Sequence, residues 1–199
     1  MLQHIRDFAA VCAQSLPLPA PVYEFGSYQV EDHPVDGDLR PLFPDVQFVG
    51  ADMRPGPGVD VTLDLHHLDL PDSSVGTALL FDTLEHVERP WEAIAEVQRV
   101  LTDEGMLVLS VPFSFPIHSY PNDYWRFTPE GVRSLLRPFA EVWVSPIGDP
   151  GNPLSVVAVA AKGVKGEQMW DEFESVIRPH IQLWDALMRH WEQEGYPTG

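Results

Sequence analysis

The chain has 199 residues, which suffices for one α/β domain with a substantial core and is too short for two ordinary domains. Its 30 acidic and 12 basic residues give a formal net charge of −18, which disfavours binding to nucleic acid phosphates or to anionic membranes. The single cysteine, Cys12, excludes an internal disulfide and a cysteine-based zinc site. Because no apolar run approaches a membrane span and no leader-like pattern opens the chain, we expect a cytoplasmic protein.

The N-terminal segment predicts a helix, a rigid link and a strand. Residues 1–14 place apolar side chains on one helical stripe, so we expect a helix packed on the body of the domain. The proline-rich run 16–21 cannot be helical and serves as a link. Residues 22–25 then form a short strand, and Gly26 directly after it lets the backbone turn sharply and approach a ligand closely.

The segment after this strand has little room for the full helix that a doubly wound fold normally places there. Residues 29–45 are polar and are interrupted by prolines and a glycine, which leaves one or two helical turns around 38–43. Strands are expected next at 46–51 and at 59–63. Each of these strands ends at an aspartate.

Residues 79–112 predict a strand, a helix and a second strand. The apolar run 79–81 closes at Asp82, as expected for a strand buried on both faces. The helix that follows has apolar positions at three- and four-residue steps. Gly105 is expected to close a tight turn before the strand 106–111. Parallel strands joined by a helix place their loops at the carboxyl edge of the sheet, where such folds bind ligands.

The C-terminal part predicts an aromatic loop, a short helix and two further strands. The loop 113–127 is rich in aromatic residues and prolines, and it precedes Thr128, a typical helix N-cap followed by proline. Strands are expected at 141–147 and 156–161, separated by a turn-rich segment.

The tail 168–194 has apolar residues at helical spacing, and Pro179 within it indicates either a kink or two helices. Three tryptophans lie on this stripe, at positions 170, 184 and 191. So large an apolar face on a terminal helix predicts packing across the sheet or a homodimer interface. We therefore expect an α/β domain over residues 1–165 and a helical appendage over 166–199.

Acidic residues stand at or near the ends of the first four predicted strands: Glu24, Asp52, Asp64 and Asp82. In a parallel sheet these carboxylates converge on one groove. An acid at the end of the second strand can accept hydrogen bonds from both hydroxyls of a ribose. Asp64 is placed to accept from an exocyclic amine, with Met53 and Leu65 on either side of an adenine ring.

Phosphate-rich cofactors fit this pattern poorly. No glycine-rich loop ends in Lys-Ser or Lys-Thr, which disfavours a nucleoside triphosphate. The first turn offers Gly26 where a dinucleotide fold needs three glycines, and a pyrophosphate would meet an acidic rim. A nucleoside that carries a positively charged sulfonium suits the acidic groove better. A nicotinamide cofactor is the least favoured alternative.

Several of these stretches resemble the class I S-adenosylmethionine (SAM) dependent methyltransferases, in particular the small single-domain type 11 group. VYEFGS is similar to the first motif of that family, VGADM to the second, and LEHV followed by RVLTDEGMLVLSVP to the remainder. The resemblance spans about residues 22–138. It implies a doubly wound, Rossmann-like α/β fold of about seven mostly parallel strands with an antiparallel last strand and helices on both faces.

Position by position, the resemblance implies a SAM site. Glu24 and Gly26, with Ser27 and Tyr28 after them, would border the methionine part of SAM. Asp52 would bind the ribose, Met53 and Leu65 would pack on the adenine, and Asp64 would accept from its amino group. Asp82 and Thr83 would line the cleft near the methionine. Tyr28 stands where the family usually has its second glycine, so it either swings out to cover the cofactor or weakens SAM binding.

The sequence predicts transfer of a methyl group to an oxygen or nitrogen of a small molecule, such as a saccharide or secondary metabolite. Alignment supplies most of the acceleration of such a transfer, and a base is needed only for a hydroxyl or a protonated amine. The base candidates are His118, Asp123 and Tyr124, in the aromatic loop expected to roof the acceptor pocket, and His86, for which packing at the start of a helix is the favoured role. No metal site is expected. The alternative is an inactive methyltransferase-like protein that acts as a binding or assembly subunit.

Overall fold

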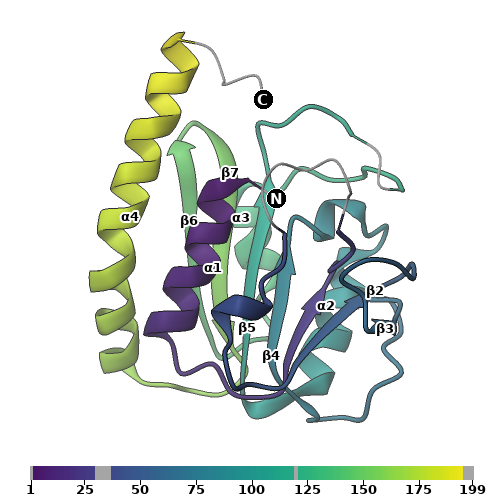
Figure 1. Cartoon of the computed structure of the whole chain (residues 1–199). Helices are drawn as coiled ribbons and strands as arrows, with labels where there is room; N and C mark the ends of the chain where they lie inside the picture. Colours follow the sequence, from purple (N-terminus) through teal and green to yellow (C-terminus); the bar gives the residue numbers. More distant parts are fainter. Residues whose placement is uncertain (1, 30–36, 119–120, 195–199) are drawn as a thin grey trace.

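The computed structural model describes residues 2–29, 37–118 and 121–194, and the side-chain surroundings up to residue 189. Seven strands form one sheet in the order β3-β2-β1-β4-β5-β7-β6 (Figure 1). Neighbouring strands among β1 to β5 are parallel, whereas β7 is antiparallel to both β5 and β6. The expected Rossmann-like sheet with an antiparallel last strand is confirmed. The strands are β1 (Val22–Phe25), β2 (Phe48–Asp52), β3 (Val61–Thr62), β4 (Val75–Phe81), β5 (Leu101–Pro112), β6 (Glu141–Asp149) and β7 (Asn152–Ala161).

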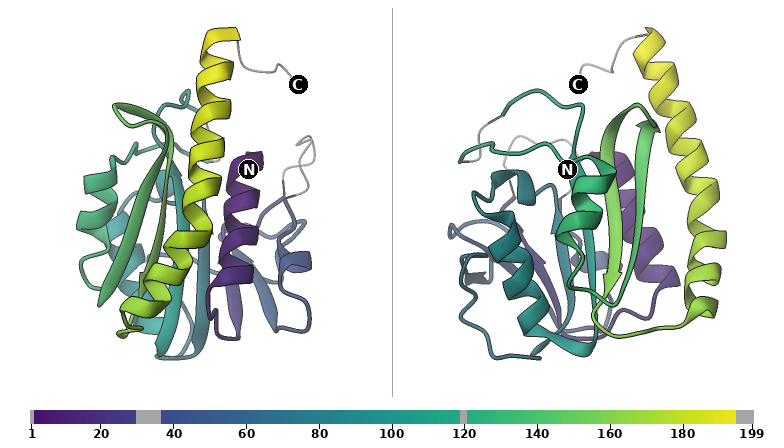
Figure 2. Two further views of the ribbon diagram at one scale, coloured as in Figure 1. Left: turned by 90° about the vertical axis from the view of Figure 1, so that its left-hand side faces the viewer. Right: turned by 180° about the vertical axis from the view of Figure 1, so that it is seen from behind.

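Helices cover both faces of this sheet (Figure 2). On one face, α2 (Pro90–Val100) and α3 (Pro129–Leu135) bury their apolar sides in a core with β4, β5 and β7. On the other face, α1 (Gln3–Ser15) and α4 (Glu167–Glu194) build a second core with the same strands. The predicted N-cap is confirmed, because the Thr128 hydroxyl accepts a hydrogen bond from the Gly131 backbone N–H at 3.0 Å.

Between β1 and β2 the described residues, 26–29 and 37–47, contain one 3-10 turn, η1 (Arg40–Leu42), within the segment 38–43 where one or two helical turns were expected. The N-terminal helix α1 packs on the same face of the sheet. Phe8 of α1 meets Phe81 of β4 edge to face at 6.4 Å, and it stacks on Trp143 of β6 at 6.4 Å. A helix from before the first strand thereby covers sheet area that η1 is too small to bury.

The central βαβ unit differs from its prediction at both strand starts. The strand β4 begins earlier than predicted, at Val75, which pairs with Leu101, and all residues from Val75 to Phe81 are buried. The strand β5 begins at Leu101, directly after α2, and its register with β4 shifts between the pairs Val75↔Leu101 and Thr77↔Met106. The predicted tight turn ending at Gly105 is therefore wrong. Residues 102–105 form an irregularity inside the strand, where polar side chains face outward.

The C-terminal tail forms one helix, so the two-helix alternative is wrong. Pro179 lies inside α4, and the helix bends along its length (Figure 2). Phe173 and Ile177 before the proline and Trp184 and Met188 after it are buried in the same core. Packing on both sides of the proline continues the helix through it. Trp191 lies outside the residues whose side chains are described, and the expected domain boundary after residue 165 stays a prediction.

Among the residues of α4 whose side chains are described, Val176, Leu183 and Leu187 are exposed and apolar. None of the helices in the described part of the chain combines the length and the apolar character that crossing a bilayer requires.

Candidate active site

A cavity of about 780 Å³ opens at the carboxyl edge of the sheet. Its walls come from the ends of β1, β2 and β4, from the segment after β3, and from the loops that follow β4 and β5. All ten residues predicted for cofactor binding line it: Glu24, Gly26, Ser27, Tyr28, Asp52, Met53, Asp64, Leu65, Asp82 and Thr83. Of the base candidates, His86, His118 and Tyr124 line the cavity and Asp123 does not.

The first turn of the cavity wall requires a glycine. Gly26 has φ +92, and a Cβ atom built on it would lie 2.3 Å from the Thr83 hydroxyl. Thr83 in turn donates to the backbone carbonyls of Phe25 and Phe81, at 3.1 and 3.0 Å. The ends of β1 and β4 therefore approach each other across Gly26, and a side chain there would push them apart.

At the end of β2, the carboxylate of Asp52 and the ring of Tyr28 both contact Arg54. Asp52 Oδ1 accepts a hydrogen bond from the Arg54 backbone N–H at 2.9 Å, which holds the carboxylate at the strand end. The Arg54 guanidinium carbon lies 4.5 Å from the centre of the Tyr28 ring. The Tyr28 ring also packs directly against Gly56, where a Cβ would lie 2.3 Å from it. Tyr28 is thus held against the loop after β2, at the wall of the cavity.

The segment after β3 contributes a second acid. Asp64 Oδ1 accepts from the backbone N–H of His66 at 2.9 Å and lies 2.8 Å from its ring Nδ1. Burial opposes ionisation of Asp64, but these hydrogen bonds outweigh it and lower the pKa of the carboxyl. Leu65 beside it is buried, whereas Met53 on the neighbouring loop is 56% exposed. An exposed thioether and a buried leucine both line the cavity here.

The end of β4 holds a third acid in an unusual conformation. Asp82 has φ +47, a left-handed conformation that few residues other than glycine adopt. Its Oδ1 accepts from the Ser110 hydroxyl at 2.7 Å, and its backbone N–H donates to the Ser110 carbonyl at 3.1 Å. The neighbouring strand β5 therefore holds both the carboxylate and the backbone of Asp82 at the cavity.

Two polar groups from β1 and its turn are buried at the cavity wall. Burial raises the pKa of Glu24 to about 8, against an opposing effect of Arg40. The Ser27 hydroxyl is also buried and has no hydrogen-bond partner among the described residues. Such groups are rare in folded proteins unless a ligand or water completes them.

A network of polar contacts between Arg40 and Asp60 was not predicted from the sequence. Asp60 Oδ2 accepts from the Gly50 backbone N–H at 2.8 Å and from Arg40 Nη2 at 2.6 Å, and Arg40 also donates to the Gly58 carbonyl at 3.0 Å. These hydrogen bonds connect η1 and the loop before β3 to the middle of β2. The residues of this network are 10 to 20 positions apart, so no local motif announces it.

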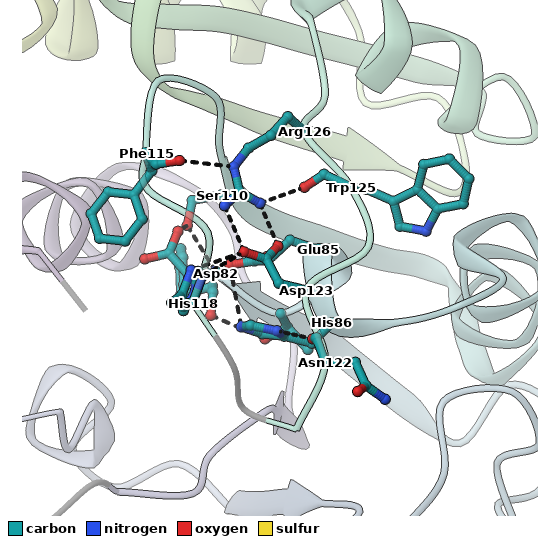
Figure 3. A network of polar contacts seen from close by, with 12 residues as sticks. Asp82, Glu85, His86, Ser110, Phe115, His118, Asn122, Asp123, Trp125 and Arg126 are labelled. Carbon is teal, nitrogen blue, oxygen red and sulfur yellow. Dashed lines mark hydrogen bonds and ion pairs between the residues drawn. The ribbon is translucent and has the colours of Figure 1, made fainter.

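The loop after β5 is held by one buried ion pair (Figure 3). Arg126 binds both oxygens of Asp123, whose side chain is 3% exposed, and it donates to the carbonyls of Phe115 and Pro116. The arginine holds the pKa of the Asp123 carboxyl well below its usual range. Asp123 Oδ2 also accepts from the backbone N–H of His118 at 2.9 Å. The pair thereby shapes the turn that presents His118.

This loop docks on η2 (Leu84–His86), the turn after β4. The backbone N–H groups of Tyr124 and Trp125 donate to the Glu85 carbonyl at 2.7 and 3.3 Å. His86 Nδ1 lies 2.6 Å from the Asn122 carbonyl. The Glu85 side chain is fully buried, and burial together with Asp82 raises the pKa of its carboxyl well above the usual value. The Tyr124 hydroxyl accepts from Asn122 Nδ2 at 2.9 Å, and Tyr124 lines the cavity.

Comparison with known proteins finds similarity to methyltransferases. Residues 46–109, from just before β2 through most of β5, match a family model described as a methyltransferase domain. A stretch of 57 residues is 44% identical to an uncharacterized 37.1 kDa protein of transposon TN4556 from Streptomyces fradiae. That stretch spans 28% of this chain and only 16% of the relative.

Solved methyltransferase structures share the fold. One is a SAM-dependent methyltransferase from Thermotoga maritima, described as a possible histamine N-methyltransferase. It is 21% identical in sequence, the alignment covers 78% of this chain and 88% of that chain, and the TM-score is 0.56. Another is the 1,6-didemethyltoxoflavin-N1-methyltransferase of Burkholderia thailandensis with bound S-adenosylhomocysteine. It is 20% identical in sequence, the alignment covers 81% of this chain and 79% of that chain, and the TM-score is 0.62. Residues 46–109 thus match a methyltransferase domain model, and the chain has the fold of the solved SAM-dependent methyltransferases.

Proposed function

We propose that the protein transfers a methyl group from SAM to an oxygen or nitrogen atom of a small molecule. The observation that supports this most is the convergence, in one cavity, of acids from the ends of four consecutive elements of the sheet. The two structural relatives named above, whose descriptions refer to toxoflavin and histamine substrates, support a small-molecule acceptor. A saccharide or secondary metabolite remains the acceptor class that we expect.

The residues present fit SAM. The cofactor supplies a methyl group activated by a positively charged sulfur. Acidic side chains along the cavity suit that charge and that of its amino group. The buried Ser27 hydroxyl, which lacks a partner among the described residues, and the buried Glu24 offer polar groups for the methionine part. Asp52 would hold the ribose, and Asp64 with Met53 and Leu65 would hold the adenine.

The acceptor would enter beneath the loop after β5. His118 and Tyr124 line the cavity there. Without a metal on its ring, His118 can take a proton from the acceptor, and the Tyr124 hydroxyl can hydrogen-bond to it. Asp123 is less suited to this role, because its carboxylate is shared with Arg126 and its pKa is lowered. We assign Asp123 the role of a positioning residue that sets the turn around His118.

Titration calorimetry with S-adenosylhomocysteine, the demethylated product, tests the cofactor site directly. We expect the full chain to bind it, and Asp52→Ala to weaken binding at least 10-fold because the ribose loses its acceptor. Asp69→Ala is a matched control, since Asp69 is exposed and does not line the cavity. Absence of binding to the folded wild-type protein would refute the proposal.

The alternative, a methyltransferase-like binding or assembly subunit, gives a different outcome. It predicts that the folded protein binds no S-adenosylhomocysteine and copurifies with a stable partner. A fold relative appears in the complex between the Haloferax volcanii Trm112 methyltransferase activator and its methyltransferase, at 14% identity, 82% and 90% coverage and TM-score 0.58. The exposed apolar side chains of α4 would suit a second copy of this chain, and sedimentation of the full chain distinguishes monomer from homodimer.

A further inference from the structure

Three potential metal ligands meet at the boundary between the cofactor end and the acceptor end of the cavity. They are Glu85 and His86 of η2 and His118 of the loop after β5. One ligand atom from each lies within 4.8 Å of the other two, and all three residues line the cavity. Figure 3 shows the two histidines beside the buried glutamate.

The Glu85 carboxylate is the least satisfied group of this cluster. Its side chain is 0% exposed, and neither oxygen has a hydrogen bond from another described residue. Its contact with His86 Nε2 is 3.8 Å, too long for a hydrogen bond. A buried carboxyl without partners is costly, and a bound cation is one of the few groups that removes this cost.

Both histidines are oriented to present Nε2 to a metal. A backbone carbonyl only accepts hydrogen bonds, so the 2.6 Å contact between His86 Nδ1 and the Asn122 carbonyl places the proton on Nδ1. His118 Nδ1 lies 3.2 Å from Asp123 Oδ2 and 3.3 Å from the Pro116 carbonyl, both acceptors. The lone pair of each ring is then on Nε2. A carboxylate or carbonyl behind the far nitrogen is the usual support of a metal-binding histidine.

We propose that Glu85, His86 and His118 bind a divalent transition-metal ion whose open coordination positions face the cavity. Two imidazoles and one carboxylate suit Zn²⁺, Mn²⁺, Fe²⁺ or Co²⁺ better than Mg²⁺ or Ca²⁺, which prefer oxygen ligands. Metal bonds of about 2.1 Å bring ligand atoms to roughly 3.0–3.5 Å from one another. The 3.8 Å between His86 Nε2 and Glu85 Oε1 requires a small closure by side-chain rotation.

The position of this ion defines the class of acceptor. A metal with three protein ligands keeps positions for a substrate oxygen, and it lowers the pKa of a hydroxyl bound there. The geometry thus favours an oxygen acceptor that can ligate a metal, such as a compound with neighbouring hydroxyl groups. This acceptor role rests on the proposed methyl transfer, whereas the metal site itself does not.

Titration of the chelator-stripped full chain with Co²⁺, followed by calorimetry and by visible absorption, tests the site. We expect one ion per chain and an absorption spectrum typical of nitrogen and oxygen ligands. His86→Gln and His118→Gln should each weaken binding at least 10-fold. His180→Gln, which changes a partly buried histidine of α4 that does not line the cavity, should bind as the wild type does. Addition of acetohydroxamate, a bidentate oxygen ligand, should change the wild-type spectrum because positions remain open.

Two outcomes would overturn the metal site: no Co²⁺ binding above that of the double variant His86→Gln/His118→Gln, or equal binding by the wild type and both single variants. S-adenosylhomocysteine binding, measured on the same samples, separates this proposal from the proposed function. Loss of cofactor binding with retained metal binding would refute methyl transfer alone. Cofactor binding without metal binding would refute the metal site alone.

Discussion

The cavity has two walls that are positioned by different means. The strand-end wall, formed by the ends of β1 and β2 and the segment after β3, is placed by the backbone ladder of the parallel sheet. The loop wall, formed by residues 113–118 and 121–127, pairs with β7 only at Phe113 and Ser114 among the described contacts, and beyond them it depends on Arg126, Asp123 and backbone contacts to η2. The strand-end wall can therefore leave polar groups such as the Ser27 hydroxyl without protein partners. The loop wall uses its charges to hold its own shape.

The largest effect we expect concerns the buried acid of the strand-end wall. Folding raises the pKa of Glu24 from its ordinary 4.5 to about 8, because burial opposes the charge. The folded state then holds a proton that the unfolded state has lost, so stability is full below pH 4.5 and falls as pH rises to about 8. The loss reaches roughly 4–5 kcal/mol, since each pKa unit corresponds to about 1.4 kcal/mol.

Urea denaturation across this range checks the prediction, with Glu24→Gln as the variant whose side chain does not titrate. The difference in unfolding free energy between the two proteins should change steadily between pH 4.5 and 8 and be constant above. Glu172→Gln, an exposed glutamate of α4, should leave the wild-type profile unchanged. A pH-independent difference would mean that Glu24 is charged in the folded protein.

The second effect concerns the ion pair of the loop wall. Asp123→Ala leaves the partly buried Arg126 guanidinium without its carboxylate, and removing one partner of a buried pair costs about 3 kcal/mol. Glu130→Ala is the matched control: its pair with Arg133 has the same three-residue spacing but is exposed, so we expect a change below about 0.5 kcal/mol.

If the two walls are positioned independently, Asp123→Ala should leave the affinity for S-adenosylhomocysteine within about two-fold, while Co²⁺ binding weakens. Calorimetry on the folded variant measures both. A loss of cofactor affinity as large as that of Asp52→Ala would show that the walls are coupled, and the comparison would fail.

The smallest effect concerns the unpartnered hydroxyl. Ser27→Ala removes a buried polar atom that has no partner among the described residues, so we expect a gain of about 0.5–1 kcal/mol in stability. The same change should weaken S-adenosylhomocysteine binding several-fold. Ser110→Ala is the contrast, because its hydroxyl donates to Asp82 at 2.7 Å and its loss should destabilise by about 1 kcal/mol. Destabilisation by Ser27→Ala would mean that the protein itself satisfies this hydroxyl.

The strand-end wall was predictable because its signals are local. An apolar run followed by an acid gives both the strand and the residue at its end, and parallel pairing brings such ends together. This reasoning found the acids, and the resemblance to methyltransferases added residues such as Tyr28 and Thr83; all ten predicted cofactor residues lie around one cavity. The predicted turn at Gly105 failed for a complementary reason. Pairing with Val75 draws Leu101 into the strand, and a single-sequence pattern does not contain that pairing.

The loop wall could be predicted only as a location. The aromatic loop contained His118, Asp123 and Tyr124 as candidate bases, but nothing in their spacing indicated that Arg126 binds Asp123 or that the loop docks on the Glu85 carbonyl. The Glu85–His86–His118 cluster was likewise missed, since His118 lies 32 positions after His86. The local signal for this cluster was the adjacent pair Glu85 and His86, which follows the strand β4.

The sequence by itself determined the fold class, the N-cap at Thr128, and the acids that stand at the strand ends, because these depend on periodicity and on near neighbours along the chain. Tertiary structure decided the protonation of Glu24, the continuity of α4 through Pro179 and the assembly of Glu85 with two histidines. Burial and long-range packing set these properties, and both arise only when distant segments meet.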